Sequence, residues 1–281
     1  MSPRVAIEPD PPRFRGGSGE PLVLLHGGGG TWRLWRRTLP YLTPHRDVLA
    51  PTLLGHWGAA PARPPSIETL ADGVEREMDA AGFDTADIAG GSLGTWVALE
   101  VARRGRARSL TLIGPTGGWD RGSMAWRQLE WLYRALHWGP KLLALNPVPF
   151  STRPRLRRWM TWHHFAHAER MPPYDFAHLL VGVARWPDFD EAIAWARDNC
   201  ELQGLDEVKC PVLLAFPEKD YVLPRALHEP RLRAGLPHAD VTTLPDTGHA
   251  AMVDDPELVA EIILSFNPRA YKSADRLATR W

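Results

Sequence analysis

The chain has 281 residues, and its 33 Lys and Arg balance its 33 Asp and Glu, so the formal net charge is zero. This balance argues against a protein that grips nucleic acid or an anionic membrane, because both need a sustained positive field. With 44% hydrophobic and 23% charged residues, the composition is typical of a globular protein and excludes intrinsic disorder. Cys200 and Cys210 are too few for a disulfide framework or a four-cysteine zinc site.

No stretch of the sequence approaches the roughly 18 consecutive apolar residues of a membrane span. Residues 1–15 lack the apolar stretch of a secretory signal. We therefore expect a cytoplasmic protein whose partner is a small molecule, with no nucleic acid and no membrane. The polar tail at 269–281 ends in Trp281, which could dock on a partner subunit, so a homo-oligomer stays open.

Short apolar runs bounded by Gly, Pro or Asp alternate with helical stretches, which is typical of βαβ units and a parallel sheet. The predicted strands are 22–25, 47–50, 87–89, 110–113, 212–216 and 241–244. The predicted helices are 66–81, with Ser66 as N-cap, 93–103, with Gly105 at its C-terminal end, and 256–266.

From 117 to 204 the sequence shows no convincing strand, only helical stretches separated by prolines. We therefore predict an α/β fold with a mostly parallel, doubly wound sheet flanked by helices. Residues 1–116 and 205–268 would form this core. An all-helical cap would span 117–204, and a tail 269–281.

The sequence Gly90-Gly91-Ser92-Leu93-Gly94 matches G-x-S-x-G between a predicted strand and a predicted helix. A sharp strand-to-helix turn crowds its neighbours, so small residues must flank the serine. The turn also lifts the hydroxyl clear of the sheet and points the helix N-terminus at a reacting carbonyl.

With this motif the chain resembles the α/β-hydrolase fold family, whose catalytic residues run in the order serine, acid, histidine. The resemblance extends to Asp220, which follows the strand 212–216, and to His249, which follows the strand 241–244. It implies that Ser92 is the nucleophile, His249 its base, and Asp220 the acid that orients the imidazole. Glu218 and Asp120 remain alternative acids.

The segment His26-Gly27-Gly28-Gly29-Gly30 directly follows a predicted strand. Glycine lets backbone N–H groups approach a developing oxyanion to about 3 Å, because no Cβ intervenes. By resemblance the oxyanion donors are the N–H groups of Gly28 and Leu93. Gly29 could replace Gly28, since four glycines leave the register open. We expect His26 to hold this loop rather than to act in catalysis.

Three positions narrow the function within the family, and a fourth, Thr52, departs from the family's usual pattern. Thr52 stands where its Asp-x-x-Gly-His turn usually has aspartate, which puts the local loop geometry in doubt. Ser92 argues against haloalkane dehalogenases and epoxide hydrolases, which use aspartate at the elbow. Ala250 after His249 disfavours carbon–carbon bond hydrolases, which commonly have an aromatic residue there. Gly91 before Ser92 disfavours the hormone-sensitive-lipase branch.

The predicted cap holds eight of the 13 tryptophans, and we expect most of them to form its own core. A cap over the site must also present apolar surface to the substrate, which predicts a largely apolar pocket. His163 and His167 have the spacing of metal ligands on a helix, but no third ligand stands out, so we expect ordinary histidines. The basic run around Arg155 we interpret as a solvated face.

We therefore predict a serine hydrolase that cleaves carboxylic esters of apolar or aromatic small molecules through an acyl-enzyme, without cofactor or metal. A lactonase or a carbon–carbon bond hydrolase could use the same triad. A ligand-binding relative without catalysis is the alternative from another class, since fold does not fix function.

Overall fold

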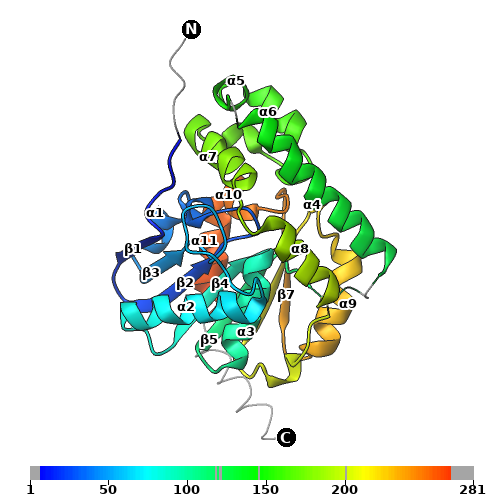
Figure 1. Cartoon of the computed structure of the whole chain (residues 1–281). Helices are drawn as coiled ribbons and strands as arrows, with labels where there is room; N and C mark the ends of the chain where they lie inside the picture. Colours follow the sequence, from blue (N-terminus) through cyan, green and yellow to red (C-terminus); the bar gives the residue numbers. More distant parts are fainter. Residues whose placement is uncertain (1–6, 118, 120–121, 145, 200, 267–281) are drawn as a thin grey trace, which may run out of the picture.

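A seven-stranded sheet runs through the molecule in the order β1-β3-β2-β4-β5-β6-β7 (Figure 1). The structure is a computed structural model that describes residues 7–117, 119, 122–144, 146–199 and 201–266. Six strands run parallel, and the edge strand β1 is antiparallel to β3. The strands are β1 Arg13–Gly17, β2 Glu20–Leu25, β3 Arg46–Pro51, β4 Ala86–Gly91, β5 Ala107–Ile113, β6 Val212–Pro217 and β7 Asp240–Leu244.

All six predicted strands are present with slightly longer ends, and the mostly parallel sheet is confirmed. The sequence analysis missed β1, because its five residues RFRGG contain no apolar run and stay partly or fully exposed. At the edge of the sheet, this segment is extended by its ladder to β3, and Arg13 and Arg15 also bond Glu77 and the carbonyl of Ala81, respectively.

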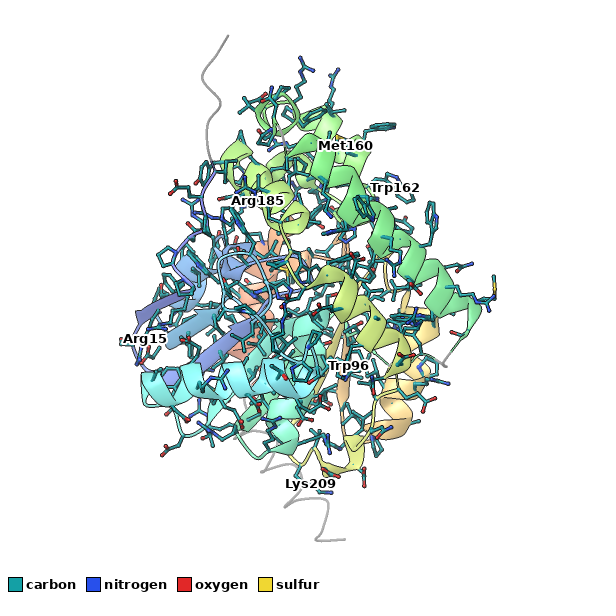
Figure 2. The ribbon with its side chains drawn as sticks, in the orientation of Figure 1. Arg15, Trp96, Met160, Trp162, Arg185 and Lys209 are labelled. Carbon is teal, nitrogen blue, oxygen red and sulfur yellow. The ribbon has the colours of Figure 1, made fainter. Side chains whose placement is uncertain are left out.

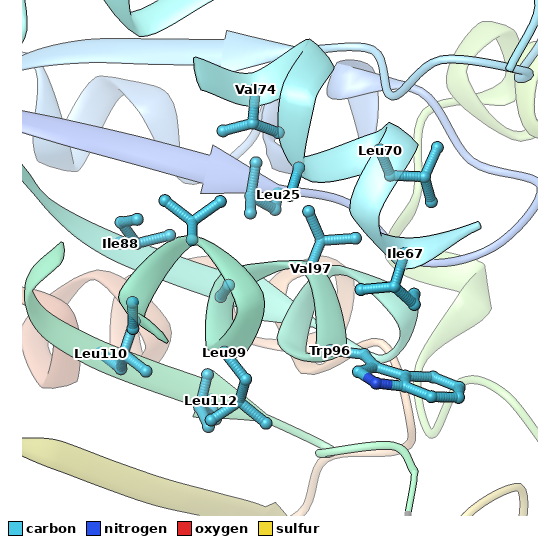
Figure 3. Close-up of a cluster of buried hydrophobic side chains, with 14 of the residues drawn as sticks. Leu25, Ile67, Leu70, Val74, Ile88, Trp96, Val97, Leu99, Leu110 and Leu112 are labelled. Atoms are coloured by element: carbon cyan, nitrogen blue, oxygen red, sulfur yellow. The ribbon is translucent and has the colours of Figure 1, made fainter. Parts of the chain in front are cut away.

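Helices cover both faces of the sheet, because alternate strand residues point to opposite sides. Val23 and Leu25 pack in one buried cluster with α2 and α3, shown in Figure 3. Leu22 and Leu24 pack in a second cluster with α1 and α11. These helices and their neighbours are α1 Leu39–Leu42, α2 Ile67–Ala81, α3 Leu93–Arg103, α9 Arg225–Gly235, α10 Ala251–Asp254 and α11 Pro256–Ser265, with 3₁₀ turns η1 Trp32–Trp35 and η3 Leu205–Glu207.

The predicted helix ends agree with the structure. The Ser66 hydroxyl accepts the N–H of Thr69 at 3.2 Å, as an N-cap should. Gly105 follows the end of α3 with a φ of 78°, a left-handed conformation that costs glycine nothing.

The helical insertion, residues 117–204, lies outside the sheet and is drawn in green in Figure 1. The described part of it forms helices and turns and contains no strand. Its elements are α4 Met124–Leu143, α5 Val148–Ser151, α6 Pro154–Thr161, η2 Ala168–Arg170, α7 Pro173–Ala184 and α8 Phe189–Asp198.

One expectation about the insertion is wrong, and a second, the solvated basic run, is wrong only for Arg157. Only Trp119, Trp126 and Trp186 of its eight tryptophans are fully buried and Trp195 is partly so, while four are exposed, namely Trp131, Trp138, Trp159 and Trp162. Arg157 in the basic run is buried, where its guanidinium donates to the carbonyl oxygens of Met171 and Glu169.

Other expectations concern residues that the structure does not describe, namely Asp120, Cys200 and the tail with Trp281. Within the described ranges, no helix combines the length and the apolarity needed to cross a bilayer.

Candidate active site

The chain turns sharply at Ser92, between β4 and α3. Ser92 has φ 51° and ψ −120°, a backbone conformation that non-glycine residues rarely adopt. A Cβ at Gly90 would lie 2.5 Å from the carbonyl oxygen of Gly94, and one at Gly94 would lie 2.4 Å from that of Leu25. The G-x-S-x-G glycines are therefore required by close backbone approach, and they hold the serine at the carboxyl edge of the sheet.

Asp220 and His249 come together from two different loops at this edge. The Asp220 Oδ2 atom lies 2.8 Å from Nδ1 of His249. The other carboxylate oxygen accepts the N–H groups of Val222 at 2.9 Å and Leu223 at 2.7 Å. Because both oxygens are occupied and both side chains are buried, the carboxylate holds the imidazole in one tautomer and orientation.

Gly114, at the end of β5, makes room for this pair. A Cβ there would lie 3.3 Å from both Asp220 Oδ2 and His249 Nδ1, and the φ of Gly114 is 53°. The side chain of any larger residue at this position would crowd the two atoms that form the hydrogen bond, Asp220 Oδ2 and His249 Nδ1.

Glu218, the alternative acid, points away from His249. Its side chain is exposed, and its Oε2 accepts the backbone N–H of Asp246 at 2.8 Å. Glu218 thus fastens the exposed turn before the histidine loop, while Asp220 is the carboxylate that reaches the imidazole. Asp120 cannot be compared, since it lies outside the described residues.

The glycine-rich loop follows β2, the neighbour of β4 in the sheet, with Leu25 aligned to Gly90. From β2 the chain continues to β3 on one side of this pair, and from β4 it continues to β5 on the other side. This reversal is a topological switch point, which opens a crevice at the carboxyl ends of the strands. The N–H of Gly30 donates to the carbonyl of Gly27 at 3.1 Å and closes a turn. Among the described residues, none accepts a hydrogen bond from the N–H of Gly28.

Leu93 begins α3, where helix N–H groups have no partner within the helix. Ser92 and Gly27 lie in contact distance, because a Cβ on Gly27 would be 3.2 Å from Ser92 Cβ. The two predicted oxyanion donors, Gly28 and Leu93, therefore belong to segments that flank Ser92 on both sides.

His26 holds the glycine loop in place. Its Nδ1 donates to the carbonyl of Gly27 at 2.8 Å, and its Nε2 accepts the N–H of Leu53 at 2.9 Å. Burial lowers the pKa of His26 well below the ordinary value, so the ring stays neutral. Both ring nitrogens are used in structure, which leaves none for catalysis.

Thr52 does not disturb the turn in which aspartate is usual. Its N–H donates to the carbonyl of Pro12 at 2.7 Å, and its hydroxyl oxygen lies 3.4 Å from the N–H of Trp32. The hydroxyl thus connects this turn to η1, which begins at Trp32.

Ser92 and His249 line the same cavity of about 130 Å³. We call it the histidine cavity, because three further histidines line it, namely His137, His163 and His164. None of the described residues in its wall is Asp, Glu, Lys or Arg. The described wall of the cavity therefore offers imidazole, hydroxyl and apolar surface, but no carboxylate, ammonium or guanidinium group.

A second cavity of about 90 Å³ lies beside it. We call it the tryptophan cavity, after five residues in its wall: Trp96, Trp119, Trp126, Trp186 and Trp195. Trp96 projects from the first turn of α3 (Figure 3), and its ring centroid lies 5.5 Å from that of Trp195 in α8. Gly28, Tyr133 and Trp186 line both cavities, so they form the boundary between them.

The comparison with protein families agrees with this geometry. Residues 22–262 match the model of the alpha/beta hydrolase family. The chain belongs to this family. The resemblance inferred from the motifs is thereby confirmed.

Curated relatives of this α/β hydrolase include several kinds of hydrolase. It is 32% identical over 209 residues to an epoxide hydrolase of Mycobacterium tuberculosis, covering 72% of this chain and 94% of the relative. It is 30% identical over 258 residues to a pimeloyl-[acyl-carrier protein] methyl ester esterase of Aromatoleum aromaticum, covering 86% and 96%. Among solved structures, the epoxide hydrolase CorEH superposes with a TM-score of 0.73 at 21% identity, covering 90% of this chain and 93% of that one, which shows the fold alone.

Sequence analysis of this α/β hydrolase missed Tyr133, on α4 of the insertion. Tyr133 lines the histidine cavity together with Ser92. Burial raises the pKa of its phenol above the usual value, and the interaction with the Ser92 side chain opposes this rise. Only helical spacing with Trp126 and Leu129 marked this residue in the sequence, and that spacing indicated a core position.

His164 was missed as well. Its ring meets that of His249 edge to face, with centroids 5.6 Å apart. Burial, with smaller effects from His249 and His163, lowers the pKa of His164 well below the ordinary value. His164 therefore stays neutral beside His249. His163 and His167 do not share a helix face, since residues 162–164 form a turn and residues 165–167 are irregular. His167 bonds Asp246 at 2.8 Å.

Asp254 is the third missed residue. Its buried carboxylate accepts the N–H groups of Ala166, His167 and Gly248 at 2.8 to 2.9 Å. Burial raises the pKa of Asp254, and these three donors oppose the rise. The carboxylate joins the insertion to the loop that bears His249, so it positions the histidine without touching it.

Proposed function

We propose that this α/β hydrolase cleaves carboxylic esters of apolar or aromatic small molecules through an acyl-enzyme. Ser92 is the nucleophile, His249 the base and Asp220 the acid, and no cofactor or metal takes part. The supporting observation is the 2.8 Å contact between Asp220 and His249 in the wall of the cavity that Ser92 also lines. A binding protein would have no need of these three groups together.

In the first half of the reaction, Ser92 Oγ attacks the ester carbonyl carbon while Nε2 of His249 takes the hydroxyl proton. Asp220 keeps the proton on Nδ1 and stabilises the imidazolium. The N–H groups of Gly28 and Leu93 donate to the developing oxyanion, with the N-terminus of α3 behind them. The bond to the alcohol oxygen then breaks, and His249 returns the proton to it.

In the second half, water replaces the alcohol. His249 takes a proton from the water as its oxygen attacks the acyl carbon, and the same N–H groups hold the oxyanion. The bond to Ser92 Oγ breaks, Oγ regains the proton from His249, and the carboxylic acid leaves. Each half thus returns the three side chains to their starting protonation states.

The two cavities indicate the substrate class. The tryptophan cavity suits an apolar or aromatic acyl group, since its lining is dominated by indole rings and aliphatic side chains. The absence of Lys and Arg from the described wall of the histidine cavity disfavours an anionic substrate. The helical insertion supplies more than half of the residues that line the histidine cavity and nearly half of those that line the tryptophan cavity, and it would act as the cap.

An epoxide hydrolase, the activity named for one relative, is not our proposal. Enzymes of that type on this fold use an aspartate at the elbow, whereas this chain has Ser92 in a strained turn built for it. The relative named as a methyl ester esterase matches 86% of this chain and supports ester cleavage.

Labelling with a fluorophosphonate probe tests the proposal. The wild-type protein should be modified covalently, and Ser92→Ala should not. Ser265→Ala, at the exposed end of α11, serves as the matched control and should label like the wild type. A folded wild-type protein that does not react, or a Ser92→Ala variant that still does, would overturn the assignment of the nucleophile.

Comparing substrates then separates the alternatives that share this triad. We expect p-nitrophenyl esters to be cleaved with a higher kcat/KM than lactones or vinylogous diketones. Preference for a lactone would indicate a lactonase, and preference for a diketone a carbon–carbon bond hydrolase.

A further inference from the structure

Positive charge is concentrated in one segment of this electrically balanced chain. Between Met124 and Trp162 there are seven basic residues and one acidic residue, Glu130. The basic residues are Arg127, Arg134, Lys141, Arg153, Arg155, Arg157 and Arg158. The zero net charge that argued against a membrane partner is a sum over the whole chain, and it hides this local surplus.

The same segment exposes large apolar side chains. On α4, Met124, Trp131 and Trp138 recur every seven residues and are 66%, 72% and 56% exposed. Residues seven apart lie on one face of a helix, so they form a stripe. The ammonium group of Lys141 lies over the ring of Trp138, 3.9 Å from its centroid.

The short helix α6 repeats this combination. Arg155, Trp159 and Trp162 are spaced by four and three residues, which again places them on one side of the helix, and Arg158 adjoins them. Trp159 is 74% exposed and Trp162 58%. In Figure 2, Trp162 and Met160 lie in the green part of the chain, far from Lys209 at the other end of the molecule.

Core packing does not account for these side chains. The buried tryptophans of the insertion, Trp119, Trp126 and Trp186, all line the tryptophan cavity, and the exposed ones do not. Exposed apolar patches on this scale mark interaction sites. Indole rings beside arginine and lysine favour one environment in particular, the headgroup region of a bilayer with anionic lipids.

We propose that the outer face of α4 and α6 docks on the surface of an anionic lipid bilayer. This outer face comprises Met124, Trp131, Trp138 and Lys141 of α4 with Arg155, Arg158, Trp159 and Trp162 at α6. The tryptophan rings enter the headgroup region, and the basic groups pair with lipid phosphates. The binding is peripheral and does not depend on the ester hydrolase function proposed above.

The outer face also reaches the neighbourhood of the histidine cavity. Trp162 precedes His163, which lines that cavity, and its ring lies 5.4 Å from that of Tyr221, next to Asp220. Docking would therefore bring a bilayer close to the wall of the cavity, where an amphiphilic substrate could leave the lipid.

Cosedimentation with vesicles tests the docking. The full chain should sediment with phosphatidylcholine vesicles that contain phosphatidylglycerol and should not sediment with pure phosphatidylcholine. Binding should weaken as salt is added, because the charges are exposed to solvent. The partition coefficient should fall at least about tenfold in the double variant Arg155→Glu/Arg158→Glu, because each basic residue contributes to surface attraction. It should also fall at least about tenfold in a second double variant, Trp131→Ser/Trp138→Ser.

Two matched controls keep the result specific. Lys209→Glu/Arg233→Glu makes the same change in net charge on other elements and should bind within about twofold of the wild type. Leu227→Ser removes an exposed apolar residue of α9 and should also bind normally. Circular dichroism and turnover of a water-soluble ester should be unchanged in all variants, which shows that they fold.

Three outcomes would overturn the proposal. The wild type fails to bind anionic vesicles at low salt, or the control variants lose as much binding as the outer-face variants. Alternatively, light scattering shows a dimer that Trp131→Ser/Trp138→Ser dissociates, in which case the outer face is a contact between two copies of this chain.

Discussion

The histidine cavity and the tryptophan cavity share three boundary residues, Gly28, Tyr133 and Trp186, yet they are built differently. Hydrogen bonds to carboxylates fasten the wall of the first, as Asp220 and Asp254 show. Indole and aliphatic packing forms most of the second. Directional hydrogen bonds thus fix the geometry of the histidine cavity, whereas packing mainly fixes the volume of the tryptophan cavity.

This difference separates two tasks of a hydrolase. Hydrogen bonds are directional, so they suit a site where a proton must pass between defined atoms. Apolar packing is non-directional and depends on the area removed from water, so it suits the selection of an acyl group by size. Changes to the first cavity should therefore alter turnover, and changes to the second should alter substrate preference.

The largest effect should come from removing the Asp220 carboxylate that is hydrogen-bonded to His249. Asp220→Asn presents an amide to Nδ1, favours the wrong tautomer and should lower kcat by about 10³- to 10⁴-fold for p-nitrophenyl esters. Glu218→Gln, two residues away and bonded to Asp246, should stay within about threefold of the wild type. The assignment of the acid is wrong if Glu218→Gln costs more than Asp220→Asn.

The next effect concerns the stability of the histidine cavity. Asp254→Ala leaves three backbone N–H groups without their acceptor, which should lower the free energy of unfolding by about 2–4 kcal/mol. Urea denaturation measures this loss. Asp255→Ala is the matched control, because it removes only the cap bond to the N–H of Leu258 and should cost about 1 kcal/mol. Equal losses in both variants would contradict the fastening role of Asp254.

Sequence analysis proposes candidate residues whose position follows from strand order. Ser92, Asp220 and His249 each follow a parallel strand, and the carboxyl ends of parallel strands meet at one edge of the sheet. It names Asp220 as the acid by resemblance and keeps Glu218 as an alternative, since both lie in the same loop. That choice depends on which side chain turns inward, where N–H groups of Val222 and Leu223 receive it.

Residues of the insertion were beyond this kind of inference. Tyr133 and His164 reach the site only because the helices of the insertion pack over it, and no local pattern encodes that packing. The exposure of Trp131 and Trp159 was missed for a related reason. Helical spacing shows which residues share a face, but it does not show whether a neighbour covers that face.

A cavity-filling variant should change preference without changing the chemistry. Ala192→Leu adds three carbon atoms to a residue that lines the tryptophan cavity. We expect kcat/KM for long-chain or aromatic acyl esters to fall about tenfold, and that for the acetyl ester to change less than about twofold. Ala135→Leu, exposed on α4, is the control and should leave the series unchanged. Equal losses on all esters would show that the tryptophan cavity does not hold the acyl group.

The smallest effect should come from the boundary between the cavities. Tyr133→Phe keeps the ring and removes the hydroxyl that interacts with the Ser92 side chain, which should lower kcat by about three- to tenfold with little change in KM. Because burial raises the pKa of Tyr133, the phenol stays protonated at neutral pH, and the pH–rate profile should keep its shape between pH ~5 and ~9 in the variant. Steady-state kinetics across that range tests both points. A loss of kcat as large as that of Asp220→Asn, or a shifted pH–rate profile, would mean that the phenol takes part in proton transfer. Tyr133 would then act in the reaction itself and not only as a residue between the two cavities.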